Sequence, residues 1–425
     1  MKKNLTIIMI LLIAVSSSYS QSGENMQALI PIISDIQSIT QKDEGRFWNV
    51  KYAVPILFVN PENRQTVVFD NGKEPYIVQL ENTIPVANTG INWNGKMWAM
   101  IKMPLPEDSW ECEKLILHEM FHALQPQLGF DSIYETPNAH LEKEEGRVLL
   151  RLEMHALLKA LEQSNDKDSV YKHITHALSF RNSRYAIYPE AKEEENYLEL
   201  NEGLAEYTAL MMTQRYSPNK LDNSILIKYF KTRASLFEQQ GSFVRQFAYE
   251  TIPLYGYLIQ MNIPDWHQTV TKNTNLTDYF INIMNVNSNE EWKTLGLQYN
   301  YETIAAEEQI YTEQINADVN VVKEKFFCIN HVEIPLFQYN YTFYPLNIRI
   351  IETIGEFHKD ITIMDNWGKV QVSNGLILDK ENGRALLSPV IRVENGVITG
   401  DGWELHLNDG WKIEQKGDKM VIVEE

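Results

Sequence analysis

The sequence predicts an α+β protein in which an N-terminal β-sheet precedes a mostly helical lobe and a C-terminal all-β module. Three stretches of different character support this order. Segments of β type dominate residues 47–103, helical spacing dominates residues 118–325, and short apolar runs separated by Asn-Gly and Asp-Gly pairs dominate from residue 326 onward. The expected parts have the bounds 21–107, 108–325 and 326–425.

The first twenty residues are typical of a secretory signal peptide. Lys2 and Lys3 precede an apolar run from Leu5 to Val15, and small residues follow up to Ser20. The run is too short to cross a bilayer as a permanent helix. We therefore expect a signal peptide at 1–20, export to the periplasm or the extracellular space, and no transmembrane segment after cleavage.

The composition limits the class of partner. The 425-residue chain has a formal net charge of −19 at pH 7. So acidic a protein is a poor ligand for nucleic acids or anionic membrane surfaces, and we expect neither as a partner. The two cysteines, Cys112 and Cys328, lack metal-type spacing, so we expect two small buried side chains in preference to a disulfide.

The N-terminal part begins with helical spacing over residues 24–42 and then changes to strands. An Asn-Pro-Glu-Asn turn at 60–63 separates two apolar runs, which predicts a hairpin. Pro104 and Pro106 end the strand region, because proline cannot donate to a sheet ladder. The predicted strands are residues 53–59, 65–69, 76–80 and 96–102.

A helix is expected over residues 111–124, and it carries the pattern His118-Glu119-Met120-Phe121-His122. Histidines four residues apart lie on one helix face, so both imidazoles can reach one metal ion. The glutamate between them can reach a water on that metal. This is the H-E-x-x-H arrangement of zinc hydrolases, in which Glu is the general base and zinc the Lewis acid. Asp108 or Ser109 is expected to cap the helix.

A catalytic zinc ion usually has three protein ligands, so a third must come from elsewhere in the chain. A histidine six residues after His122 is excluded, because residue 128 is leucine. Glu202 and Glu206 are four apart and share one face of a later helix. One carboxylate can bind the metal, and the other can accept the N–H of a ligand histidine and fix its orientation. The predicted helices of this lobe are 141–161, 169–185, 190–214, 223–239, 243–260, 276–284 and 302–316.

The C-terminal module is expected to consist of short strands joined by tight turns. Residues 402–407 alternate apolar and polar side chains with period two, as in a strand with one buried face. Asn-Gly and Asp-Gly pairs favour the two-residue turns of β-hairpins. Such pairs begin at Asn374, Asn382, Asn395, Asp401 and Asp409.

His118-Glu119-x-x-His122, followed by Asn201-Glu202-Gly203-x-Ala205-Glu206, resembles the gluzincin family of zinc metallopeptidases. The resemblance covers these two motifs and the strand-then-helix order before them, with no close match along the whole chain. It implies a zincin-like core in which His118, His122 and Glu202 bind zinc. It further implies Glu119 as the general base and Glu206 as the support of a ligand histidine. The spacing departs from the family, because seventy-nine residues separate His122 from Glu202 and a shorter interval is usual.

Three assignments within this resemblance stay open. Glu142 lies at the usual interval and is the alternative metal ligand, although no Asn precedes it and Gly146 stands four residues later. Tyr249-Glu250 resembles the segment that supplies an oxyanion donor in aminopeptidase-type gluzincins, which implies Tyr249 as that donor and Tyr255 as its alternative. The edge strand beside the zinc helix, expected at residues 96–102, is implied to pair with an extended substrate.

The leading expectation is a secreted, zinc-dependent metallopeptidase that acts on a peptide or protein substrate with Zn²⁺ as its cofactor. Glu119 would take a proton from the attacking water and return it to the leaving amine. The alternative is a catalytically degenerate zincin scaffold that acts as an envelope or secreted binding protein through its β module. All five motif residues are intact, which favours the enzyme.

Overall fold

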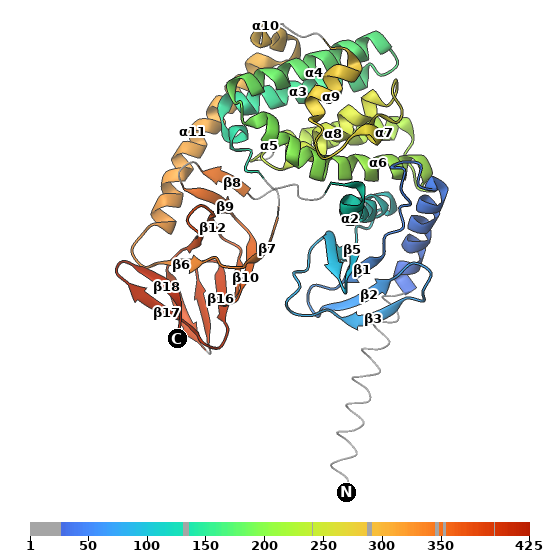
Figure 1. Ribbon diagram of the computed structural model, residues 1–425. Coiled ribbons are helices and arrows are strands. Elements are labelled where there is room, and N and C mark those ends of the chain that lie inside the picture. The colour runs from blue at the N-terminus through green and yellow to red at the C-terminus, as the bar shows by residue number, and fades with distance from the viewer. Residues whose placement is uncertain are drawn as a thin grey trace. The chain divides into compact units, whose positions relative to one another are not determined.

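The computed structural model describes residues 27–130, 136–239, 241–286, 291–344, 348–351, 354–394 and 396–425. The predicted signal peptide at 1–20 lies outside the described residues. The chain forms two compact units. Unit 1 comprises residues up to 131 together with 204–222 and 265–272, and unit 2 comprises 132–203, 223–264 and 273–425. The α+β class, with a helical lobe and C-terminal β-sheets, is confirmed (Figure 1).

Unit 1 is built on a five-stranded mixed sheet with the strand order β3-β2-β1-β5-β4. The predicted hairpin is present, since β1 pairs antiparallel with β2. The sequence pattern did not predict β4, which pairs with β5, forms one edge of the sheet and contacts helix α2. The strand at 96–102 was expected at that edge and is internal instead, because β1 and β4 flank it. The strands are β1 (Ile56–Val59), β2 (Gln65–Phe69), β3 (Tyr76–Gln79), β4 (Thr89–Trp93) and β5 (Lys96–Lys102).

The helices of unit 1 pack on this sheet and on one another. Asp108 caps α2 (Ser109–Leu128), because its side chain accepts a hydrogen bond from the Glu111 amide at 2.9 Å. Gly129 ends α2 in the left-handed conformation. Helix α6 (Leu204–Tyr216) packs along α2. A helix over residues 27–43 and the short η3 (Trp266–Thr269) complete the unit.

An aromatic cluster joins the separate segments of unit 1. His267 stacks on Phe47 with ring centroids 4.2 Å apart, and its Nε2 donates to the Phe47 carbonyl at 2.7 Å. Trp48 Nε1 donates to Thr208 Oγ1 at 3.0 Å. Because Phe47, Thr208 and His267 come from three segments of the chain, these contacts hold α6 and η3 against the N-terminal part of the unit.

The helical part of unit 2 follows the predicted order of helices, with short additional elements at η1, α10 and η4 and with changes in two of the predicted helices. The helix expected at 190–214 is divided, because a π-helical turn stands between α5 and α6. The last helix continues beyond residue 316 to Phe326. The elements of this part are η1 (Ala139–Glu142), α3 (Glu144–Glu162), α4 (Lys167–Ile187), α5 (Ala191–Leu198), η2 (Glu199–Gly203), α7 (Asn223–Glu238), α8 (Gln246–Ile259), α9 (Leu276–Met284), α10 (Trp292–Gly296), η4 (Leu297–Tyr299) and α11 (Tyr301–Phe326).

The C-terminal part of unit 2 contains a six-stranded and a seven-stranded sheet with the orders β14-β15-β16-β11-β10-β7 and β17-β18-β6-β13-β12-β9-β8. Buried residues of both sheets, such as Trp403 and Leu378, form one core, so the module is a β-sandwich. The strands are β6 (His331–Pro335), β7 (Asn340–Phe343), β8 (Ile348–Ile351), β9 (Gly355–His358), β10 (Ile361–Asp365), β11 (Gly368–Val372), β12 (Leu376–Asp379), β13 (Arg384–Leu387), β14 (Val390–Glu394), β15 (Val397–Gly400), β16 (Trp403–Leu407), β17 (Trp411–Lys416) and β18 (Lys419–Glu424).

Two further predictions concern the cysteines and the membrane. Cys112 and Cys328 are both unbridged, and Cys112 is buried as expected, whereas Cys328 is only half-buried. Among the helices of the described chain, none combines the length and the apolar character that a membrane crossing requires.

Candidate metal centre

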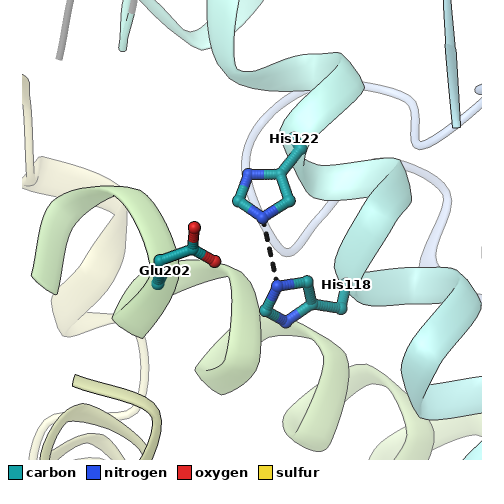
Figure 2. Close-up of side chains that lie close together, drawn as sticks. All are labelled: His118, His122 and Glu202. Atoms are coloured by element: carbon teal, nitrogen blue, oxygen red, sulfur yellow. Dashed lines mark hydrogen bonds between the residues drawn. The ribbon is translucent and has the colours of Figure 1, made fainter. Parts of the chain in front are cut away.

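The two histidines of the motif lie on one face of α2, and their Nε2 atoms are 3.1 Å apart (Figure 2). His118 Nδ1 is 3.0 Å from Glu206 Oε2, and His122 Nδ1 is 3.0 Å from Gln125 Oε1. A carboxylate and an amide oxygen both accept hydrogen bonds, so each Nδ1 carries the proton in this arrangement. Both Nε2 atoms therefore direct lone pairs at the same point, an arrangement that a cation between them stabilises.

Glu206 is itself fixed by a second partner from α2. Lys114 Nζ donates to Glu206 Oε1 at 2.7 Å, and both side chains are buried. With one oxygen paired to this ammonium group, the carboxylate can accept a hydrogen bond from His118 with its other oxygen. This pairing sets the His118 tautomer and leaves Nε2 as the atom that could bind a metal ion.

Glu202 supplies the third donor. It lies in η2, which continues without a break into α6, so the packing of α6 along α2 brings its carboxylate to the two imidazoles (Figure 2). One ligand atom each from His118, His122 and Glu202 lies within 4.8 Å of the other two. His118 and Glu202 are buried and His122 is half-buried. A triad capable of holding a metal ion is therefore present.

The π-helical turn is held in place by close packing in unit 2. A Cβ atom on Gly203 would lie 2.7 Å from Ile252 Cγ1 and 3.1 Å from the Ala248 carbonyl oxygen, so only glycine lets η2 approach α8 this closely. Asn201 Nδ2 donates to Glu202 Oε1 at 3.3 Å, and Arg245 Nη2 lies 3.6 Å from the same oxygen. These neighbours restrict the Glu202 carboxylate to the orientation that it has in the triad.

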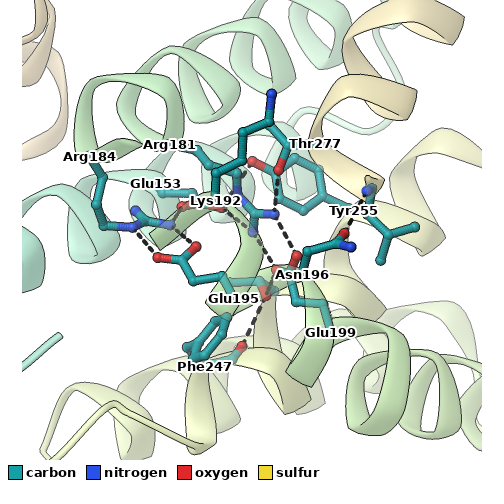
Figure 3. Close-up of polar contacts among 12 residues, drawn as sticks. Glu153, Arg181, Arg184, Lys192, Glu195, Asn196, Glu199, Phe247, Tyr255 and Thr277 are labelled. Atoms are coloured by element: carbon teal, nitrogen blue, oxygen red, sulfur yellow. Dashed lines mark hydrogen bonds and ion pairs between the residues drawn. The ribbon is translucent and has the colours of Figure 1, made fainter. Parts of the chain in front are cut away.

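A buried ionic cluster fixes the start of η2 (Figure 3). Arg181 Nη1 donates to Glu199 at 2.9 Å, its Nη2 lies 2.7 Å from the other oxygen of the same carboxylate, and its Nε donates to Glu153 at 2.7 Å. Arg184 pairs with Glu195 at 2.6 Å in the same cluster. All these side chains are fully buried. Removing one partner from such a pair typically costs about 3–5 kcal/mol, so Glu199 anchors η2 three residues before Glu202.

The cluster has more acidic than basic groups. Three carboxyls face two guanidinium groups, and His140 Nε2 lies 2.7 Å from Glu195 Oε1. Burial raises the pKa of Glu199 to about 7, against the opposing effect of Arg181. Burial alone would lower the pKa of His140, but the carboxylates of Glu194 and Glu195 raise it overall. Glu199 and His140 therefore hold protons that they would release in water, whereas Arg184 lowers the pKa of Glu195 against the effect of burial.

Of the remaining predicted catalytic residues, Glu119 is buried next to His118 in α2. Tyr249 is half-buried in the first turn of α8. Tyr255 lies further along α8, fully buried, and its hydroxyl donates to Glu153 at 3.1 Å. Burial raises its pKa well above the ordinary value. Because this hydroxyl belongs to the ionic cluster (Figure 3), we assign it no role at the metal.

The alternative ligand Glu142 does not belong to the triad. Glu142 is the last residue of η1, and its carboxylate accepts a hydrogen bond from Ser242 Oγ at 2.5 Å. Burial raises its pKa to about 7, which favours the protonated form and disfavours metal binding. The long interval between the two motifs is filled by α3, α4 and α5, which run between η1 and η2.

Three residues at the site were not predicted. Lys114 stands four residues before His118, and Gln125 stands three residues after His122, so helical spacing could have identified both. Arg245 comes from the start of α8 and lies beside Glu202 only because the chain folds back. Nothing in its local sequence indicates this position.

No family model, curated protein or solved structure matches the chain.

Proposed function

We propose that the protein is a zinc-dependent metallopeptidase with His118, His122 and Glu202 as ligands. The observation that carries the proposal is the convergence of three donors from two motifs far apart in the sequence. Two Zn–N bonds of about 2.0–2.1 Å at a tetrahedral angle separate their nitrogens by about 3.3 Å, close to the 3.1 Å between the Nε2 atoms. Two imidazoles and one carboxylate also match the ligand set of catalytic zinc sites that keep a position for water.

The residues of the chain then have distinct roles. When bound, zinc would polarise the substrate carbonyl and acidify a water molecule. Glu119 takes the proton of the attacking water and returns it to the leaving amine. Glu206 holds His118 in the tautomer required for binding, with Lys114 as its counter-ion. Tyr249 is the proposed donor to the oxyanion.

The proposal includes a substrate orientation and a location. The edge strand β4 lies against α2, and Gly90 in it approaches the backbone of His122 so closely that an added Cβ would lie 2.6 Å from the His122 carbonyl carbon. An extended peptide could add to this edge by backbone hydrogen bonds. The N-terminal sequence supports export of the mature enzyme.

The test combines metal analysis with cleavage of unfolded proteins and fluorogenic peptides. We expect one zinc per chain, cleavage that a chelator abolishes and zinc restores, and loss of cleavage without loss of zinc in Glu119→Gln. Glu111→Gln is the control, because it changes a partly exposed acid in the first turn of the same helix that is not a proposed ligand.

A different result would redirect the assignment. Stoichiometric zinc without cleavage of any substrate would contradict the enzyme and favour a scaffold that binds through the β-sandwich. Full zinc occupancy in Glu202→Ala would contradict the ligand set while leaving a metal-dependent activity open.

A further inference from the structure

A cavity of about 450 Å³ lies within unit 2, where the loop before η1 and the start of α8 meet strands of the β-sandwich. Its volume falls in the range of roughly 300–1,000 Å³ that is usual for ligand sites. Branched aliphatic and aromatic side chains form much of the lining, among them Val244, Phe343, Ile350 and Ile354. The β-sandwich contributes most of this wall, so the module is part of the site.

One lining residue connects the cavity to the metal triad. Arg245 lines the cavity, and its Nη2 lies 3.6 Å from the Glu202 carboxylate. Its guanidinium carbon also lies 5.2 Å from the centre of the Phe343 ring. The arginine thus spans the short interval between a proposed zinc ligand and the aromatic wall of the cavity.

Two charged groups of the cavity wall, Lys380 and Glu356, are paired with each other. Lys380 Nζ lies 2.8 Å from Glu356 and donates to the Tyr341 hydroxyl at 3.2 Å. Tyr341 and Phe343 stack at 5.5 Å with nearly parallel rings. The apolar lining favours bulky hydrocarbon side chains.

We propose that this cavity is a substrate subsite that takes bulky apolar side chains of a peptide next to the bond that is cleaved. Two observations identify the occupant. Arg245 connects the cavity to the metal triad, which indicates part of the substrate, and the apolar lining indicates a hydrocarbon side chain. The inference rests on the proposed peptidase function, and it assigns the β-sandwich a role in substrate selection.

The first experiment measures selectivity with a panel of acetylated, amidated hexapeptides that carry Phe, Leu or Gly at each position. We expect kcat/KM to favour Phe or Leu over Gly at one position by about tenfold to a hundredfold. Ala139→Phe places a ring in the cavity and should reduce that ratio about tenfold. Ala306→Phe, on the exposed face of α11 and outside the cavity lining, is the matched control and should leave the ratio unchanged.

A second variant and a binding measurement keep the test decisive if Ala139→Phe does not fold. Phe343→Ala removes part of the aromatic wall and should also reduce the ratio. Binding of an acetylated, amidated Leu- and Phe-containing hexapeptide is followed by calorimetry in Glu119→Gln, alone and combined with each cavity variant. Both cavity variants should weaken this binding about tenfold.

The outcomes separate the subsite from the reaction. Chelator-sensitive cleavage with the same selectivity in wild type, Ala139→Phe and Phe343→Ala would overturn the subsite and leave the peptidase proposal standing. Peptide binding that both variants weaken, without any cleavage by the wild type, would support the cavity and contradict the peptidase. A wild-type enzyme without apolar preference at any position would also overturn the subsite.

Discussion

At the scale of single residues, the tautomer of His118 decides whether its Nε2 atom is available to a metal ion. The Nδ1 proton is directed at Glu206, whose other oxygen is paired with Lys114 inside the protein. An exposed ion pair would contribute little, but this one is buried on both sides and orients the ring of a proposed ligand. We therefore expect Glu206 to affect metal affinity without being a ligand.

Glu206→Gln should lower zinc affinity about tenfold to a hundredfold, because the amide has lost the charge that holds the His118 N–H and the Lys114 ammonium. Competition with a fluorescent zinc chelator measures this change. Glu111→Gln removes a partly exposed carboxylate 3.7 Å from the same lysine and should alter the affinity less than twofold. Equal affinity in wild type and Glu206→Gln would remove Glu206 from the metal centre.

The sequence predicted some residues of the candidate site and not others. The four-residue intervals in the two motifs place each pair of side chains on one helix face, which the structure bears out through α2 and the continuous η2–α6. The position of Arg245 beside Glu202 could not be predicted, because it depends on the packing of α8 against η2. Spacing encodes neighbours on one helix, whereas contacts between helices depend on the tertiary fold.

At the scale of elements, a close contact with strand β4 determines how near α2 lies to the sheet. Gly90 in β4 faces the α2 backbone at His122 and Ala123, where an added Cβ would lie 2.6–2.9 Å from three main-chain atoms. Main-chain atoms in a capped helix cannot move away singly, in contrast to the end of a flexible side chain. The glycine thus fixes the distance between the edge strand and a proposed ligand.

Gly90→Ala should destabilise unit 1 by about 1–3 kcal/mol and weaken zinc binding, because α2 must shift away from β4 at His122. Urea unfolding and zinc competition measure the two effects. Gly241→Ala is the matched control, since its Cβ would meet only the end of the Arg349 side chain at 3.3 Å. Unchanged stability in Gly90→Ala would show that the strand and the helix have more room than the structure indicates.

Local patterns predicted whole elements better than their edges and interruptions. Alternation and turn residues gave four of the strands of unit 1, but β4 was missed because Gly90 and Asn92, two residue types depleted in strands, interrupt its Thr-Gly-Ile-Asn-Trp segment. Helical spacing runs through 190–214 without a break, so the π-helical turn at 199–203 was not visible. That turn depends on the ionic cluster and on the Gly203 contact, both of which involve side chains from distant segments.

At the scale of the whole molecule, buried charge makes stability depend on pH in a direction opposite to ordinary acid denaturation. The pKa of Asp70 is lowered by Lys73 and Lys96, and its contribution to stability is lost as the pH falls below about 4. Glu199 behaves in the reverse manner. The folded chain retains its proton up to about pH 7, whereas the carboxyl has an ordinary pKa of 4.5 once it is exposed by unfolding.

The contribution of Glu199 is therefore fully present below pH 4.5 and is lost as the pH rises to about 7. At 1.36 kcal/mol per pKa unit, the shift corresponds to roughly 3 kcal/mol over this window. The raised pKa of His140 acts in the same direction, because its contribution is lost as the pH rises through the pKa in the folded protein. We expect the urea midpoint to decrease between pH 5 and pH 8.

Glu199→Gln should flatten this decrease, because glutamine has no proton to release, even if the absolute stability falls through a poorer contact with Arg181. Circular dichroism in urea, with a chelator present so that metal binding adds no pH dependence, measures the slope. Glu193→Gln changes an exposed acid on the neighbouring α5 and should keep the wild-type slope. If wild type and Glu199→Gln lose stability equally between pH 5 and pH 8, Glu199 is ionised in the folded protein, and the excess proton of the cluster resides on His140.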